Sequence, residues 1–275
     1  MYFSALDAQK YGRTGLVELD LDDSLRVIAE SEGPVLDIGL PGIFDDCGAN
    51  AFSVLSAGTT TFLYYQGWQR AERVPHLIFT GLAIDAGEGM GFQKYSRTPI
   101  LDRREDDPYL RGAPFVVRQG DLFRMWYVSC SRWVEDVHGL NYRVGIRHAV
   151  SDDGVTWSAD PGPCVTPVAP HEYAVGRPSV LVVKGTYHMW YSIRSFDRPY
   201  RIGHAVSPDG LSWTRVDAEM GIDRSAHGWD SKMVCYPNVV RIDDRLLMLY
   251  NGNQHGATGF GYAEASVADL PDDAR

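Results

Sequence analysis

The sequence has few cysteines and no long apolar run, and both absences limit what the protein can be. Its four cysteines, Cys47, Cys130, Cys164 and Cys235, are scattered without a CxxC pair, so neither a disulfide framework nor a zinc site is expected. No apolar run is long enough to cross a bilayer, and the N-terminal residues lack the pattern of a signal peptide. We therefore expect a cytoplasmic protein with free thiols that needs no metal, cofactor or membrane.

Positive charge is also scarce. The chain has 26 lysines and arginines against 36 aspartates and glutamates, a formal net charge of −10. Such a chain would be repelled by nucleic-acid phosphates and by an anionic membrane surface. The GxSxG, P-loop and HExxH motifs are absent as well. The expected partner is a small molecule or a glycan substrate, and the sequence predicts no particular oligomeric state.

A repeat organises the whole sequence. The segment HAVSDDGVTW at 148–157 recurs as HAVSPDGLSW at 204–213, and weaker copies flank the pair. The core tyrosines of four copies fall 62, 64 and 59 residues apart, and the motif of the third strand occurs five times. Repeats of this length, made of short aromatic and β-branched runs, are typical of β-propeller blades. We predict an all-β fold, a single five-bladed β-propeller over residues 1–275, closed by joining the N- and C-terminal strands.

The first three repeats are expected to form four strands each, and the fourth to form three, at 236–244, 245–253 and 259–266. In the third repeat the strands are expected at 176–185, 186–194, 200–207 and 211–217, with a turn at Lys184-Gly185. The N-terminal segment 15–30 reads as the third and outer strands of a further blade. Trp157 and Trp213 of the repeated motif are expected to pack in the blades rather than to bind sugars.

The connections that lead into the inner strands carry the candidate site, because in a propeller they meet at one mouth of the central channel. They are rich in polar residues, and carboxylates from different blades could act there as the acid and the base of glycosidic bond cleavage. The alternative for each aspartate is a structural turn cap, and for the amide-rich segment 251–256 it is a hairpin. The candidate catalytic residues are Asp45, Asp46, Glu172 and Asp230. The candidate substrate-binding residues are Arg111, His171, Arg177, Lys232, Tyr236, Asn251, Asn253 and His255.

Five segments, 176–181, 189–194, 200–213, 228–240 and 248–263, resemble a known group. This group is the five-bladed propeller superfamily of glycoside hydrolases, which includes arabinanases, invertases and β-mannoside phosphorylases. The likeness is greatest to uncharacterised glycosidase-like proteins associated with polysaccharide or glycoconjugate biosynthesis. It implies a catalytic acid pair and a third, modulating acid from separate blades. Asp45 or Asp46 would match the base, and Glu172 or Asp230 the acid and the modulator.

One departure from the superfamily pattern bears on the chemistry. The residue after Trp229-Asp230-Ser231 is commonly Glu in that pattern, and here it is Lys232. Lys232 with Arg111, Arg177 and His171 could form a cationic wall for a phosphate or carboxylate on the ligand. Alternatively, Arg177 and Lys232 could form salt bridges with acids of neighbouring blades.

Three functional hypotheses therefore remain open. The first is a glycosidase-like enzyme with a carboxylate mechanism, acting at the anomeric bond of a sugar conjugate that carries an anionic group. The second is a biosynthetic transferase, phosphorylase or other enzyme that has kept the same pocket. The third is a non-catalytic sugar-binding propeller.

Overall fold

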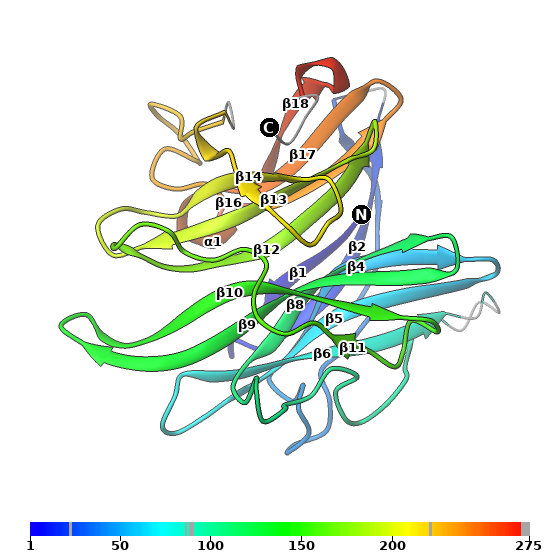
Figure 1. Cartoon of the computed structure of the whole chain (residues 1–275). Helices are drawn as coiled ribbons and strands as arrows, with labels where there is room; N and C mark the ends of the chain where they lie inside the picture. Colours follow the sequence, from blue (N-terminus) through cyan, green and yellow to red (C-terminus); the bar gives the residue numbers. More distant parts are fainter. Residues whose placement is uncertain (22–23, 86, 88–90, 220–221, 271–275) are drawn as a thin grey trace. The chain divides into compact units, whose positions relative to one another are not determined.

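The computed structural model describes residues 1–21, 24–85, 87, 91–219 and 222–270, and strands dominate it (Figure 1). The chain separates into two compact units, and each is described by itself. Unit 1 comprises Met1–Met125 and Val150–Ser158, and unit 2 comprises Trp126–Ala149 and Ala159–Arg275. Within the described residues, none of the helices has the length and apolar character that a membrane crossing needs. The single closed five-bladed domain stays a prediction.

Unit 1 is built of antiparallel hairpins joined side by side. Its strands pair in the order β1-β2-β4-β5-β6-β8, with β3 on β2 and β7 on β6. The two pairs β2–β4 and β6–β8 are parallel, and they mark where one repeat ends and the next begins. The strands are β1 (Tyr2–Leu6), β2 (Gly12–Asp20), β3 (Arg26–Glu30), β4 (Gly48–Ala57), β5 (Thr60–Arg70), β6 (His76–Asp85), β7 (Gln93–Lys94) and β8 (Arg111–Gln119).

Unit 2 contains the third and fourth repeats. Strands β9 (Leu122–Asp136) and β10 (Gly139–Ser151) run through the boundary between the units. In unit 2, β10 pairs in parallel with the inner strand of the third repeat, and the last three strands form an antiparallel sheet. The other elements are β11 (Ser158–Ala159), β12 (Glu172–Val183), β13 (Thr186–Ser195), β14 (Arg201–Ser207), β15 (Thr214–Arg215), β16 (Cys235–Ile242), β17 (Arg245–Asn251) and β18 (Phe260–Ser266), with short helices η1 (Asp217–Glu219), α1 (Asn253–Gly256) and η2 (Val267–Asp269).

The strand predictions for the repeats are confirmed, with two differences. In the third repeat β12, β13 and β14 follow the expected order, and Lys184 and Gly185 have φ of 51° and 86°, as a tight hairpin turn requires. The outer strand is only two residues long, because its backbone pairs with β14 solely at Ala205 and Val206. The N-terminal segment forms the antiparallel pair β2–β3, but β1, which pairs with β2, was not predicted.

The repeated motif is architectural, as predicted. One carboxylate oxygen of Asp209 accepts the N–H groups of Leu211 and Ser212, both at 2.8 Å, and this holds the turn. Trp213 packs edge-on against Trp126 with ring centroids 6.2 Å apart, so it joins the second and third repeats within unit 2. The Trp126 indole also donates to the Gly210 carbonyl at 2.9 Å. The conspicuous motif therefore builds the core, and the site must be sought elsewhere.

A stack of buried rings fills the middle of the third repeat. His188 on β13 and His204 on β14 are both buried, and a ring nitrogen of one lies 3.2 Å from a ring nitrogen of the other. Trp190 stacks on His204 at 5.0 Å between centroids. Burial lowers the pKa of His188 to about 4, and burial together with His188 lowers the pKa of His204 to about 3. Both rings are therefore neutral in the folded protein at neutral pH.

We predict that these histidines make stability fall with acidity. Their folded pKa values lie below the ordinary 6.5, so the unfolded chain takes up protons first as the pH falls. The free energy of unfolding should therefore fall from about pH 6.5 to about pH 4, by up to about 1.4 kcal/mol per pH unit for each histidine. Urea unfolding across this range should show a shallower pH slope for His188→Gln than for the wild type. The exposed His227→Gln is the control, and equal slopes for wild type and His188→Gln would contradict the prediction.

Candidate functional site

Two aspartates predicted as catalytic lie in the protein core, each bonded to a core tyrosine. In unit 1, Asp45 is 0% exposed, accepts the Tyr65 hydroxyl at 2.9 Å and forms an ion pair with Lys94 at 2.7 Å. In unit 2, Asp230 is 3% exposed and accepts the Tyr250 hydroxyl at 2.9 Å. Burial and the neighbouring carboxylate raise the pKa of Tyr250 to about 12 and that of Tyr65 further, so both hydroxyls keep their protons and donate.

The pairing of an aspartate with a tyrosine follows the sequence repeat. Each of the two pairs is separated by 20 residues along the chain. The same spacing separates Asp107 from Tyr127 in the second repeat. In the third repeat the corresponding position is His171, and Tyr191 donates instead to Asp217 at 2.7 Å. An aspartate before the inner strand is thus a recurring structural device.

Asp45 and Asp230 therefore differ from their expected place at an open site. Both carboxylates are enclosed and each accepts a tyrosine hydroxyl, and Asp45 Oδ1 has no hydrogen-bond partner among the described residues. Asp46 is partly exposed, and one of its oxygens accepts the Gly42 N–H at 2.8 Å. Its Oδ1 is buried and has no hydrogen-bond partner among the described residues. Of the two aspartates considered for the base, Asp46 is the one whose side chain is partly exposed.

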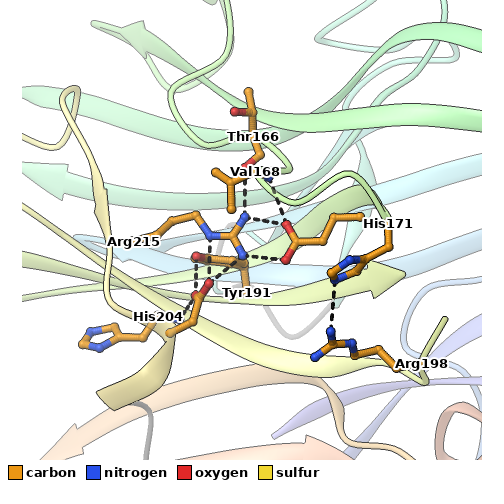
Figure 2. A network of polar contacts seen from close by, with 9 residues as sticks. Thr166, Val168, His171, Tyr191, Arg198, His204 and Arg215 are labelled. Atoms are coloured by element: carbon orange, nitrogen blue, oxygen red, sulfur yellow. Dashed lines mark hydrogen bonds and ion pairs between the residues drawn. The ribbon is translucent and has the colours of Figure 1, made fainter. Parts of the chain in front are cut away.

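Glu172, the first residue of β12, is held by an arginine. Arg215 on β15 donates to both Glu172 oxygens, at 2.8 and 3.2 Å, and also to Asp217 at 2.6 Å (Figure 2). The Val168 N–H adds a bond to Glu172 at 3.1 Å. Asp217 in turn accepts the Tyr191 hydroxyl, so one buried network joins β12, β13 and β15. A bidentate pair of this kind fixes the position of the Glu172 carboxylate.

The charge state of Glu172 follows from this network. Burial alone would raise the pKa of the Glu172 carboxyl, but the bonds from Arg215 and from the Val168 N–H outweigh it and hold that pKa below its ordinary value. A general acid must be protonated near neutral pH, and Glu172 is ionised there. The geometry gives it a structural role, not the expected role of proton donor.

Three of the predicted binding residues also hold the chain together. Arg111 is 2% exposed and forms an ion pair with Asp107 at 3.0 Å within unit 1. The Asn253 side chain accepts the Lys232 N–H at 2.7 Å and donates to the Gly228 carbonyl at 3.0 Å, which fastens the loop before β16. Asn251 donates to the carbonyl of His255 at 2.9 Å. The amide-rich segment is therefore a brace for its neighbouring loops.

Two further candidates lie at the surface of unit 2. His171 has 31% of its side chain exposed, and its Nδ1 lies 3.8 Å from Asp197. Its Nε2 lies 3.3 Å from the Arg198 guanidinium, and Figure 2 shows these two side chains next to each other. Lys232 is exposed, and its ammonium group forms no ion pair with any described carboxylate, Asp230 included. The salt bridge considered for Lys232 is therefore absent from the described part of the chain.

The inner strands contain a second recurring feature, a residue with strained backbone. Ala113, Arg177 and Tyr236 have positive φ of 49°, 59° and 59°, and each stands directly before a proline. The pairing register shifts at the last two, between Gly176 and Ser179 on β12 and between Cys235 and Asn238 on β16. These β-bulges re-aim a side chain, and non-glycine residues in this conformation cost about 1–3 kcal/mol each and gather at functional sites.

In unit 2 the two strained residues meet in a group that we call the Tyr236 cluster, made of Arg177, Arg194, Tyr200, Tyr236 and His255. The Arg177 guanidinium lies 5.7 Å from the centroid of the Tyr236 ring. Tyr200 packs edge-on against both Tyr236 and His255, at 5.9 and 5.1 Å. The Arg194 guanidinium lies 4.7 Å from the Tyr200 centroid. The cluster thus joins three predicted residues, Arg177, Tyr236 and His255.

Sequence reasoning missed the other two members, Arg194 and Tyr200. Arg194 stands near the end of β13 and Tyr200 directly before β14, so both lie at the hairpin end where β12 and β16 also begin. Neither residue lies in the connections before the inner strands, where the site was predicted. The hairpin pattern of the third repeat could have indicated both residues. The turn between β13 and β14 lies at the same edge of the sheet as the connections before the inner strands.

Solved structures with a similar fold include glycoside hydrolases. A glycoside hydrolase matches 96% of this chain and 80% of its own, with a TM-score of 0.71 and 20% identity. Sucrose-6-phosphate hydrolase from Lactobacillus gasseri matches 91% of this chain and 50% of its own, with a TM-score of 0.64 and 13% identity. At these identities the likeness establishes a glycosidase-like fold.

The sequence comparison places the chain within a family. No protein-family model matches it. The uncharacterised protein Rv1502 of Mycobacterium tuberculosis is 37% identical over 263 residues, which cover 96% of this chain and 86% of that protein. The chain belongs to the family of this mycobacterial protein.

We predict that Tyr65→Phe destabilises the protein by about 1.5–3 kcal/mol, because it leaves the buried Asp45 carboxylate without its hydroxyl donor. Tyr64→Phe is the matched control. Tyr64 is equally buried on the same strand, but its hydroxyl donates to a neutral acceptor, the Gly154 carbonyl, at 2.9 Å. Its loss should cost only about 0.5–1.5 kcal/mol. Chemical denaturation measures both, and an equal or larger loss for Tyr64→Phe would contradict the account.

We further predict that Arg215→Met destabilises the protein by about 3–5 kcal/mol, because it leaves the buried Glu172 carboxylate and the partly exposed Asp217 carboxylate without their cation. Arg245→Met removes the exposed ion pair with Glu264 on the same unit and should cost less than about 1 kcal/mol. Urea unfolding of the two variants provides the comparison. A loss below about 1 kcal/mol for Arg215→Met would show that the network does not hold unit 2 together.

Proposed function

We propose that the protein is a glycosidase-like enzyme, built as a five-bladed propeller, that acts at a glycosidic or related anomeric bond of a sugar conjugate. The observation that carries the proposal is the strained backbone at Ala113, Arg177 and Tyr236. Strain of this kind persists only where the surrounding structure holds it, and it is typical of active sites and ligand clamps. The glycosidase-like fold supports a carbohydrate as the ligand.

Asp46 is our candidate for the carboxylate that works as base or nucleophile. Cleavage at an anomeric carbon passes through a cationic, oxocarbenium-like transition state, which an ionised carboxylate stabilises. Asp46 is partly exposed and its Oδ1 has no hydrogen-bond partner among the described residues, whereas Asp45 is fully buried and paired with Tyr65 and Lys94. Asp45 holds the connection before its inner strand in unit 1, and Glu172 and Asp230 hold those before theirs in unit 2.

The proposed substrate carries an anionic group. In unit 2 the Tyr236 cluster brings two arginines, Arg177 and Arg194, together with aromatic rings. Lys232 adds an exposed ammonium group to the same unit, and His171 adds a partly exposed imidazole. Sucrose-6-phosphate hydrolase, which shares the fold, is named for a phosphorylated sugar. We place the enzyme in the cytoplasm, in keeping with its four free cysteines.

A second candidate is an enzyme of glycoconjugate biosynthesis that has kept the pocket and changed the reaction, or a sugar-binding protein without catalysis. The observation in its favour is the chemistry of the strained positions, which carry an alanine, an arginine and a tyrosine rather than carboxylates. Glu172 and Asp230 cannot supply the missing acid because both are engaged in the core. Turnover by Asp46 variants separates the two candidates.

We predict that the protein cleaves at least one member of a panel of aryl glycosides that includes phosphorylated and uronic-acid sugars. Asp46→Asn should lower kcat/KM on that substrate at least about 100-fold, because the amide cannot take a proton or stabilise the transition state. Asp121→Asn, at a fully exposed carboxylate of the same unit, should leave kcat/KM unchanged. Full activity of Asp46→Asn would overturn the assignment, and no turnover on any glycoside would favour the second candidate.

A further inference from the structure

The guanidinium group of Arg194 lies against two aromatic rings. Its guanidinium carbon lies 4.7 Å from the centroid of the Tyr200 ring and 5.3 Å from that of the Tyr142 ring. The side chain is partly buried, and among the described residues no carboxylate pairs with it and no acceptor takes its N–H groups. Its planar fork of donors therefore remains available to a ligand, and the surrounding rings strengthen its attraction for an anion by excluding water.

A second arginine shares this neighbourhood. Arg177 and Arg194 both act on the Cys235 thiol, where their positive charges oppose the effect of burial, which raises the pKa of that thiol to about 12. Arg177 stands at a strained bulge of β12, and its guanidinium lies over the ring of Tyr236, the strained residue of β16. Burial lowers the pKa of Arg177 to about 10, so it remains cationic at neutral pH.

The rest of the Tyr236 cluster provides neutral polar groups. Burial lowers the pKa of His255, and the positive charge of Arg194 adds to that effect, so the imidazole is neutral at neutral pH. Burial, with Tyr236, raises the pKa of Tyr200, which keeps its hydroxyl proton. The cluster thus has two guanidinium groups and no carboxylate among its members, although the chain as a whole is acidic.

We propose that Arg177 and Arg194 bind the anionic group of the substrate, a phosphate or a carboxylate on a sugar, while the rings of Tyr200 and Tyr236 contact the sugar itself. This inference rests on the proposed function and names its substrate class. Guanidinium groups bind the oxygens of phosphates and carboxylates in pairs, which fixes the orientation of the anion as well as its charge. The strained bulges of β12 and β16 hold Arg177 and Tyr236 in place before the ligand arrives, so less ordering is needed on binding.

The test is isothermal titration calorimetry with four probes: glucose 6-phosphate, glucuronate, inorganic phosphate and neutral glucose. The anionic sugars should bind at least about tenfold more tightly than glucose, and added salt should weaken only the anionic probes. A tighter complex with glucose 6-phosphate than with glucuronate assigns a phosphate, and the reverse order assigns a carboxylate. Binding of inorganic phosphate as tight as that of glucose 6-phosphate would overturn the contact between sugar and tyrosines.

Arg194→Gln should weaken the tighter anionic sugar at least about tenfold, because it removes the charge and the fork. Arg241→Gln is the control, since Arg241 lies near the other end of β16 with 46% of its side chain exposed, and it should change the Kd by less than about twofold. If Arg194→Gln does not fold, Arg194→Lys decides, and it should weaken binding at least about threefold because a point charge cannot bind two oxygens in plane. Unchanged affinity in the folded variant would overturn the proposal.

Turnover assays separate this inference from the proposed function. Binding of an anionic sugar that depends on Arg194, without turnover of any glycoside, would support the site and contradict the hydrolase. Turnover of a neutral glycoside with no anion binding would support the hydrolase and overturn the site.

Discussion

The structure depends on a simple constraint, that a buried carboxylate must be paired. Asp45 and Asp230 lie in the cores of their units, and each receives the hydroxyl of a tyrosine from the second strand of its repeat. Asp217 and Tyr191 form the equivalent contact in the third repeat. An unpaired carboxylate at such a position would cost several kcal/mol, so the pair fixes the connection against the hairpin. The residues that follow, at the start of the inner strand, are thereby held in place.

This constraint separates the residues that build the protein from those available to a ligand. The aspartates bonded to tyrosines and Glu172 in its bidentate pair with Arg215 are engaged in holding the chain. The bulge residues Arg177 and Tyr236 are held in an unfavourable conformation by the paired strands on either side. Strain of this kind is tolerated only in a rigid setting, which the paired strands supply. Residues that hold the chain and residues available to a ligand thus lie close together in the sequence.

Much of the fold could be predicted from the sequence, because the same hairpin pattern of residues occurs four or five times along the chain. The strands of the third and fourth repeats and the turn at Lys184-Gly185 are where the pattern places them. Short outer strands such as β15 and the unpredicted β1 depend on pairing with distant segments, which periodicity does not report.

The candidate site could be predicted only in part, because the sequence does not show whether a carboxylate in a connection faces solvent or the core. The spacing of 20 residues between Asp45 and Tyr65, repeated in Asp230 and Tyr250, was visible in the sequence and indicates a structural pair. Arg177, Tyr236 and His255 were predicted and do meet in one cluster. Arg194 was not, since its place depends on the packing of β13 against aromatic rings from other strands.

The glycosidase-like fold and the relationship to Rv1502 leave the identity of the ligand as the central claim. The most direct measurement is a crystal structure of the protein with glucose 6-phosphate. The account predicts phosphate oxygens within hydrogen-bonding distance of the Arg177 and Arg194 guanidinium groups, with the sugar against Tyr200 and Tyr236. A phosphate bound elsewhere, with Arg194 still contacting only its two tyrosines, would contradict it.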